Sequence, residues 1–220
     1  DDWLGQDALE KVCDAFREDV DSVLFRMLYV YSDGSQKDYQ MAPFRTMTGV
    51  EAFQASLTWK IHGCYVVRNS IHMAYPYDES QRAYSDDNTT RIHYYYSRKV
   101  AYCEGIYYYR QQVASVTHKV SVRRFDFLLA NESMRRQLIA LGASEENLRC
   151  FETVRWLNLV GVYMFYYLHR NELSDADRQQ GLSIMHHVWH TINIKQVSRS
   201  VRCKFGYMPL RFSWSLFRLQ

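Results

Sequence analysis

The feature that most constrains the fold is a change in hydrophobic pattern near residue 119. Before it, short apolar runs alternate with turn-forming residues, as in the strand expected over 21–31 and the turn from Ser32 to Ser35. After it, apolar residues recur at helical spacing, which predicts three long helices, over about 120–142, 145–170 and 175–197. The expected fold is therefore α+β with few strands, followed by a mostly helical extension.

Residues with strong end preferences mark several of these helices. Thr48 and Glu51 have the spacing of a capping box and predict a helix that starts directly after Thr48. Ser144 and Ser174 are expected N-caps in the helical part, and Gly142 is expected to end the helix before Ser144. The sequence thus predicts element boundaries as well as element types.

A pair of acids opens another predicted helix. Ser85 or Asp86 is the expected N-cap, so Asp86 and Asp87 fall near the positive end of the helix, where negative charge is favoured. This helix leads into two short strands, expected over 100–103 and 106–109. A partly exposed, ionised carboxylate in such a place suits a general base, although most acids at helix starts only cap the helix.

Charge and cysteine content narrow the class of protein. The 27 Lys and Arg residues slightly outnumber the 24 Asp and Glu residues, but no acid occurs from Arg178 onward, so the rest of the chain is net acidic. Five cysteines without any C-x-x-C spacing predict reduced thiols in a cytoplasmic protein rather than a zinc site or disulfide framework. The longest apolar run, near 156–168, is too short and too polar to predict a membrane-spanning helix.

The segment 195–220 interleaves basic residues with large apolar ones. That composition suits peripheral contact with an anionic membrane, where each Lys or Arg contributes about 1 kcal/mol. A helix packed on the core with a solvated basic face explains it equally well. Nucleic-acid binding is a rival from another class, but the net acidic body of the chain and the lack of a binding motif argue against it.

Three separated segments also resemble motifs of the family 2 glycosyltransferases, the inverting GT-A enzymes of bacterial polysaccharide synthesis. They are Asp1-Asp2-Trp3-Leu4, Ser85-Asp86-Asp87, and Tyr107-Tyr108-Tyr109-Arg110 followed by Ser115-Val116-Thr117-His118. The family commonly reads D-x-D-D-W, then E/D-D, then Y-Y-Y-R…S-x-T in this order. The resemblance covers residues 1–118 and implies that they form the acceptor-side half of a GT-A domain, with 119–220 as a helical extension.

The resemblance also implies roles for individual residues. Asp1 and Asp2 would hold Mg²⁺ or Mn²⁺ on the diphosphate of a nucleotide-sugar donor, and Asp87 would be the general base, with Asp86 in place of the more usual Glu. The segment that folds over the donor diphosphate would carry Arg110, Ser115 and His118. The acceptor, a glycan or lipid-linked sugar, would lie near Trp59, Lys60 and His62.

One departure from the family pattern concerns the start of the chain. It begins inside the metal motif, and the family's nucleotide-binding half is missing, so we expect an inactive fragment of a longer enzyme. The implied setting is the cytoplasm, at the inner face of the membrane, in synthesis of capsule, lipopolysaccharide or exopolysaccharide. The alternative is a non-catalytic helical interaction module.

Overall fold

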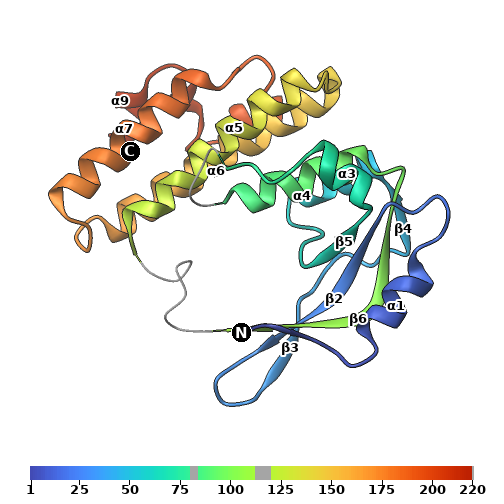
Figure 1. The fold of residues 1–220 in the computed structure, drawn as a ribbon. Helices are drawn as coiled ribbons and strands as arrows, with labels where there is room; N and C mark the ends of the chain where they lie inside the picture. Colours follow the sequence, from blue (N-terminus) through green and yellow to red (C-terminus); the bar gives the residue numbers. More distant parts are fainter. Residues whose placement is uncertain (80–83, 112–119, 220) are drawn as a thin grey trace. The chain divides into compact units, whose positions relative to one another are not determined.

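The computed structural model describes residues 1–79, 84–111 and 120–219 (Figure 1). The chain divides into a sheet unit, Asp1–Asp78 with Thr89–Lys119, and a helical unit, Glu79–Asn88 with Val120–Gln220. The expected α+β fold with a mostly helical C-terminal region is confirmed. The pattern change predicted near residue 119 lies at the edge of 112–119, outside the described residues.

The sheet unit contains a mixed six-stranded sheet built around its longest strand, β6. Its strands are β1 (Trp3–Leu4), β2 (Ser22–Val30), β3 (Gln36–Asp38), β4 (Thr46–Thr48), β5 (Tyr65–Val67) and β6 (Lys99–Arg110). The β6 strand pairs in parallel with β2 and antiparallel with β1 and β4. The β2 strand also pairs antiparallel with β3 and β5, so most of the sheet depends on these two long strands.

The two strands expected over 100–103 and 106–109 are wrong as separate elements, because β6 runs through both. Gly105 lies where β6 passes close to α1 (Ala8–Ala15), and a Cβ added there would lie 2.8 Å from the Ala8 carbonyl oxygen. Opposite it, the pairing with β2 shifts register between Leu24 and Arg26. The glycine therefore accompanies close packing and a bulge, and it does not end the strand.

Helices pack on the sheet because successive β2 side chains point to opposite faces. Val23 and Phe25 are buried with residues of α1, whereas Leu24 is buried with Ile61 and Tyr94 on the other side. The remaining helices of this part are α2 (Gly49–Leu57), α3 (Asn69–Ala74) and α4 (Ser85–Tyr96), whose first residues Ser85–Asn88 are assigned to the helical unit. The predicted capping box at the start of α2 is confirmed, with both of its hydrogen bonds present.

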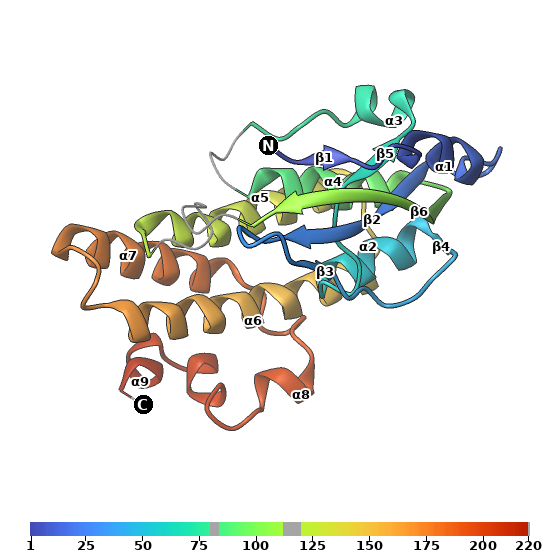
Figure 2. The same ribbon diagram turned by 90° about the horizontal axis from the view of Figure 1, so that it is seen from below.

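The helical unit consists of helices packed around one apolar core (Figure 2). They are η1 (Val122–Phe125), α5 (Asp126–Ala140), α6 (Glu145–His169), α7 (Asp175–Thr191), α8 (Arg199–Arg202), η2 (Met208–Arg211) and α9 (Trp214–Arg218). Ser144 and Ser174 cap α6 and α7 as predicted, and Gly142, with φ +69°, follows the end of α5. The predicted third helix is too long, since α7 ends at Thr191. No helix in the described part of the chain is long and apolar enough to cross a membrane.

Candidate functional site

The edge of the sheet formed by β1 and β6 joins two segments that are far apart in the sequence. Trp3 pairs with Tyr108 in the antiparallel ladder, which places the preceding residue, Asp2, beside the end of β6. The Tyr107 hydroxyl donates to Asp2 Oδ2 at 2.7 Å, and the Arg110 backbone N–H donates to Asp2 Oδ1 at 2.8 Å. Burial and this hydrogen bond both raise the pKa of Tyr107, so its hydroxyl remains a donor at neutral pH.

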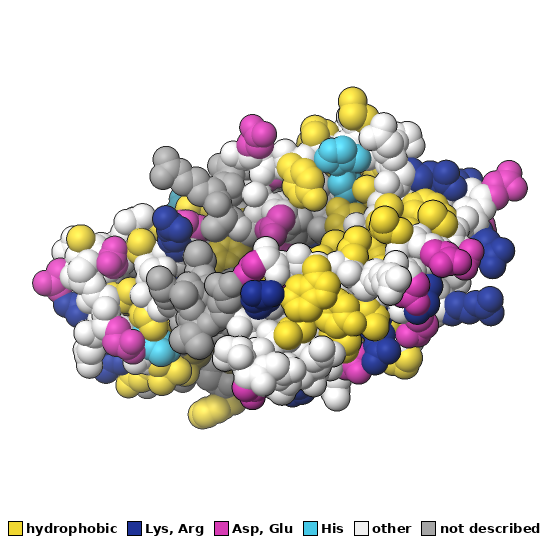
Figure 3. All heavy atoms as spheres, turned by 60° about the horizontal axis from the view of Figure 1, so that its bottom comes forward, with side chains coloured by type: hydrophobic (Ala, Val, Ile, Leu, Met, Phe, Trp, Pro, Cys, Tyr) yellow, Lys and Arg dark blue, Asp and Glu magenta, His cyan; other side chains and the backbone are white. Residues whose placement is uncertain are grey.

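This edge also presents flat aromatic surface next to charge. The rings of Trp3 and Tyr108 stack with centroids 4.9 Å apart, and the Arg110 guanidinium carbon lies 5.3 Å from the Trp3 ring centroid. Trp3 is 39% exposed, and exposed hydrophobic side chains among charged ones can be seen in Figure 3. Such an edge can contact a ligand that carries both a planar group and negative charge.

The predicted metal ligands Asp1 and Asp2 are suitable by chemistry. Asp1 is exposed, and each Asp2 oxygen that accepts a hydrogen bond keeps a second lone pair. Carboxylate oxygens are the ligands that Mg²⁺ and Mn²⁺ prefer. Within the described residues, no group of three or more His, Cys, Asp or Glu side chains could hold a metal ion.

The predicted acceptor segment begins at a strained helix end. After α2, Trp59 has φ +59°, a conformation that bulky residues rarely adopt. The Trp59 N–H donates to the Ser56 carbonyl at 3.2 Å, and the Lys60 N–H donates to the Ala55 carbonyl at 3.0 Å. These are the two hydrogen bonds of a Schellman motif, in which the left-handed position normally belongs to glycine.

The indole of Trp59 lies at the surface. The ring is 40% exposed, its centroid lies 4.7 Å from the His62 ring, and the Arg91 guanidinium carbon lies 5.5 Å from it. Lys60 is exposed and His62 half-buried, with the Tyr39 ring 5.8 Å from the His62 ring. Two of the three predicted acceptor residues, Trp59 and His62, are thus in direct contact. Strained backbone at an exposed aromatic residue is a reason to suspect function.

The predicted catalytic acids lie in the first turn of α4, as expected. Asp86 is exposed and Asp87 is half-buried. The helix begins at Ser85, one of the two residues expected to cap it, and Tyr84, with φ +65°, precedes it.

Neighbouring side chains hold this start of α4 within the helical unit. The buried Asn88 amide donates to the Ala130 carbonyl of α5 at 2.8 Å. The Tyr84 ring contacts Phe127 edge-on at 5.3 Å. Asp86 and Asp87 therefore lie between two anchored residues, on backbone that is fixed on both sides.

The remaining predicted residues are distributed as follows. Arg110 ends β6, where its backbone holds Asp2 and its guanidinium lies near Trp3. Ser115 and His118 lie outside the described residues.

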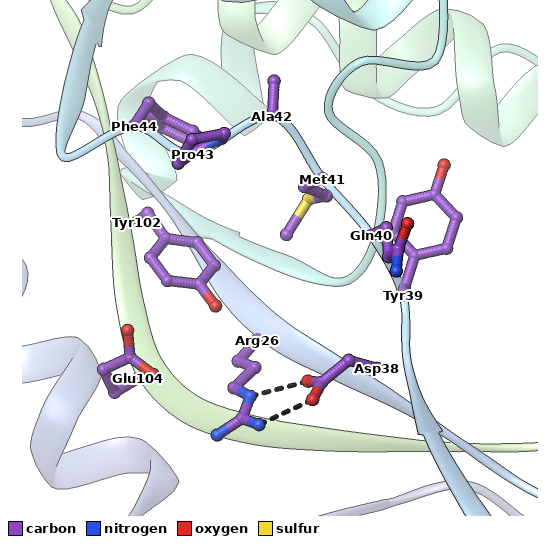
Figure 4. Close-up of a pocket in the computed structure, with 10 residues that line it drawn as sticks. All are labelled: Arg26, Asp38, Tyr39, Gln40, Met41, Ala42, Pro43, Phe44, Tyr102 and Glu104. Atoms are coloured by element: carbon purple, nitrogen blue, oxygen red, sulfur yellow. Dashed lines mark hydrogen bonds and ion pairs between the residues drawn. The ribbon is translucent and has the colours of Figure 1, made fainter.

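A cavity of about 590 Å³ in the sheet unit was missed by the sequence reasoning. Figure 4 shows its lining side chains, which come from β2, from the end of β3 and the loop after it, and from β6: Arg26, Asp38, Tyr39, Gln40, Met41, Ala42, Pro43, Phe44, Tyr102 and Glu104. Arg26 interrupts an otherwise apolar strand, and this was the one signal that could have revealed the site.

These sites offer carboxylates, an arginine and exposed aromatic rings, a set that suits a polar ligand containing sugars and phosphate. No protein-family model, no curated protein and no solved structure matches this chain.

Proposed function

We propose that the protein takes part in inverting glycosyl transfer, from a nucleotide-sugar donor to a glycan or lipid-linked acceptor. The observation that carries the proposal is the β1–β6 edge. Asp2 accepts hydrogen bonds from Tyr107 and Arg110, which lie 105 and 108 positions away in the sequence. Two of the three segments that resemble glycosyltransferase motifs therefore meet at one place in the fold. Segments that resembled the motifs only by chance would have no reason to lie side by side.

The chemistry assigns a task to each acid. Asp87 takes the proton of the acceptor hydroxyl as that oxygen attacks the anomeric carbon, an effect worth about 10²–10⁴-fold in rate. Asp86 lies next to it in the same helical turn. Asp1 and Asp2 are the candidate ligands of Mg²⁺ or Mn²⁺, which would neutralise charge on the leaving diphosphate. Arg110 adds a further positive charge at that edge.

The acceptor is assigned to the segment that begins at Trp59. An exposed indole can stack on the apolar face of a sugar ring, and Lys60 and His62 can donate hydrogen bonds to its hydroxyls. The left-handed backbone of Trp59 supports this assignment, because a residue needed only to end α2 would be glycine.

The test uses the natural protein that contains this chain. It is incubated with a panel of sugar nucleotides and acceptors, with and without Mn²⁺, and release of nucleoside diphosphate is measured. Asp87→Asn should lower turnover about 100-fold or more. Glu145→Gln is the matched control, since Glu145 is also an acid in the first turn of a helix.

Two results would contradict the proposal. One is the absence of donor-dependent release with every sugar nucleotide in the panel. The other is an Asp87→Asn variant as active as Glu145→Gln, because Asp87 would then only cap its helix and the chain would be a non-catalytic module.

We further propose that 195–220 contacts an anionic membrane surface. Within this segment, Leu210, Trp214 and Phe217 are buried in the helical core, whereas Phe205 is 96% and Leu219 83% exposed. The segment is therefore packed on the core and at the same time presents apolar side chains outward, among bases and without acids. Such a surface suits lipid headgroups and the acyl boundary.

Liposome flotation tests the membrane contact. Binding to vesicles that contain phosphatidylserine should weaken in high salt and in a Phe205→Ala, Leu219→Ala double variant. Met73→Ala is the control, since Met73 is an apolar residue of the sheet unit that is also largely exposed. Binding that is unchanged in the double variant, or a preference for oligonucleotides in a gel shift, would reject this contact.

A further inference from the structure

We propose that the cavity of Figure 4 binds a neutral sugar unit of the acceptor glycan. This inference rests on the proposed glycosyl transfer and extends the acceptor site beyond Trp59. Its volume of about 590 Å³ lies within the range of about 300–1,000 Å³ that is typical of small-ligand sites.

The cavity is tied directly to the predicted acceptor segment. The Ala42 N–H donates to the Lys60 carbonyl at 2.9 Å, and the Tyr39 hydroxyl donates to the Trp59 carbonyl at 3.3 Å. The His62 N–H lies 3.4 Å from the Met41 sulfur. The loop that lines the cavity and the segment that carries the exposed indole are therefore neighbours, so one oligosaccharide could contact both.

The polar groups of the cavity suit hydroxyl recognition, and two of them hold each other in place. Arg26 donates two parallel hydrogen bonds to the Asp38 carboxylate, both at 2.8 Å, which holds both side chains in place. Each Asp38 oxygen keeps a lone pair, and Glu104 adds a second carboxylate. Burial raises the pKa of Tyr102 to about 12, so its hydroxyl is a donor at neutral pH.

Aromatic rings also line the cavity. The rings of Phe44 and Tyr102 lie 5.8 Å apart and are tilted by 57°. In Figure 4 the Tyr102 ring lies above Glu104 and Arg26 in the view, with Phe44 on the loop above it. An apolar ring face beside carboxylates matches a sugar, which has C–H groups on its faces and hydroxyls around its edge.

The charge of the lining argues against binding of the nucleotide-sugar donor in this cavity. One guanidinium faces two carboxylates, so the cavity carries net negative charge. A phosphate or diphosphate would be repelled, whereas a neutral sugar would not. The cavity therefore fits the acceptor glycan and not the nucleotide sugar.

The test measures saturation-transfer NMR on the chain of 220 residues with a panel of methyl glycosides, without metal or nucleotide. At least one neutral glycoside should bind, and the corresponding sugar phosphates should bind more weakly. Glu104→Gln should weaken binding of that glycoside about tenfold, the equivalent of one charge-assisted hydrogen bond. Glu10→Gln, an exposed acid on α1, is the matched control, and circular dichroism verifies that both variants fold.

Three outcomes would overturn the inference: no glycoside binds, the phosphates bind better, or Glu104→Gln binds like Glu10→Gln. Failure of the proposed function has a different signature. If the chain binds glycosides through Glu104 but the natural protein releases no nucleoside diphosphate, the sugar site stands and the proposed glycosyl transfer is wrong. If Glu104→Gln still transfers the sugar with an unchanged KM for the acceptor, the proposed glycosyl transfer stands and this sugar site is wrong.

Discussion

The two units end a helix with the same hydrogen bonds but with different residues. In the helical unit, α5 is followed by Gly142 with φ +69°, whose N–H donates to the Ile139 carbonyl, while the Ala143 N–H donates to the Leu138 carbonyl. In the sheet unit, the corresponding position after α2 is Trp59, with φ +59°. A left-handed residue other than glycine costs roughly 1–2 kcal/mol. The sheet unit tolerates this cost where it presents an exposed indole, which points to a role other than ending a helix.

The units also differ in how deeply they bury ion pairs. Asp21 in the sheet unit accepts hydrogen bonds from Arg68 and Arg98, whose side chains remain partly exposed. Glu152 in the helical unit is paired with Arg135 and with Arg155, which is fully buried. Solvent can replace a lost partner in the first cluster but not in the second. The variants below test both contrasts.

The largest effect is expected at Glu152. Glu152→Gln leaves the buried Arg155 guanidinium without a counter-charge and should lower the free energy of unfolding by about 3–5 kcal/mol. Glu145→Gln, which removes an exposed pair with Arg149, should change it by less than about 1 kcal/mol. Urea denaturation measures both, and equal effects would contradict the contrast in burial.

A smaller loss is expected at Asp21. Asp21→Asn weakens charge-assisted hydrogen bonds to Arg68 and Arg98 and should cost about 2–3 kcal/mol. Asp19→Asn, at an exposed pair with Lys99, should cost less than about 1 kcal/mol. If Asp21→Asn lowers the free energy of unfolding as much as Glu152→Gln does, the exposure of Arg68 and Arg98 does not reduce the effect.

The Asp21 contribution should also depend on pH. Hydrogen bonds from Arg98 hold the pKa of Asp21 below its usual value in the folded protein. Its stabilisation is therefore complete above the unfolded pKa of about 3.9 and is lost as the pH falls through the lower folded value. Urea titrations from about pH 7 to about pH 3 should therefore show the difference in stability between the wild type and Asp21→Asn narrowing toward the acid end. A difference that stays constant would show that Asp21 is not the titrating group.

At the end of α5, Gly142→Ala should destabilise by about 1–2 kcal/mol. No heavy atom lies within 4 Å of the added Cβ, so the loss reports the backbone conformation and not a clash. Gly161→Ala, in open space within α6, should instead stabilise by about 0.5–1 kcal/mol, because alanine favours a helix interior. Thermal unfolding of the two variants checks the opposite signs.

A pair of variants at Trp59 is the most informative for the comparison. Trp59→Ala and Trp59→Gly both remove the indole, but only glycine relieves the left-handed backbone. The glycine variant should therefore be more stable than the alanine variant by about 1 kcal/mol, while both lose acceptor binding. Equal stability of the two would show that the helix end relaxes once the ring is gone.

Local features of the fold could be predicted from the sequence, whereas long-range ones could not. The caps at Thr48, Ser144 and Ser174 were predictable because their hydrogen bonds join residues three positions apart. The continuity of β6 through Gly105 depends on a bulge opposite β2, and no local pattern encodes that register. Local pattern also gave no sign of the left-handed conformation of Tyr84, directly before α4.

The candidate site follows the same division. Asp86 and Asp87 could be placed in a first helical turn, because helix starts have sequence signals. The hydrogen bonds between Asp2 and the end of β6 were not predictable, since they depend on strand pairing across more than 100 positions. The cavity was missed for the same reason, because Arg26 and Glu104 converge only when β2 and β6 pair.

The central position of β6 has a consequence for biosynthesis. Because this strand is the partner of β1, β2 and β4, synthesis must reach Arg110 before those earlier segments can complete their hydrogen-bonded ladders. Until then, the β2 edge lacks its longest neighbour, so unpaired strand is exposed during translation. Closure of long loops should also make this part slow to fold, whereas the capped helices of the second half can form locally and quickly.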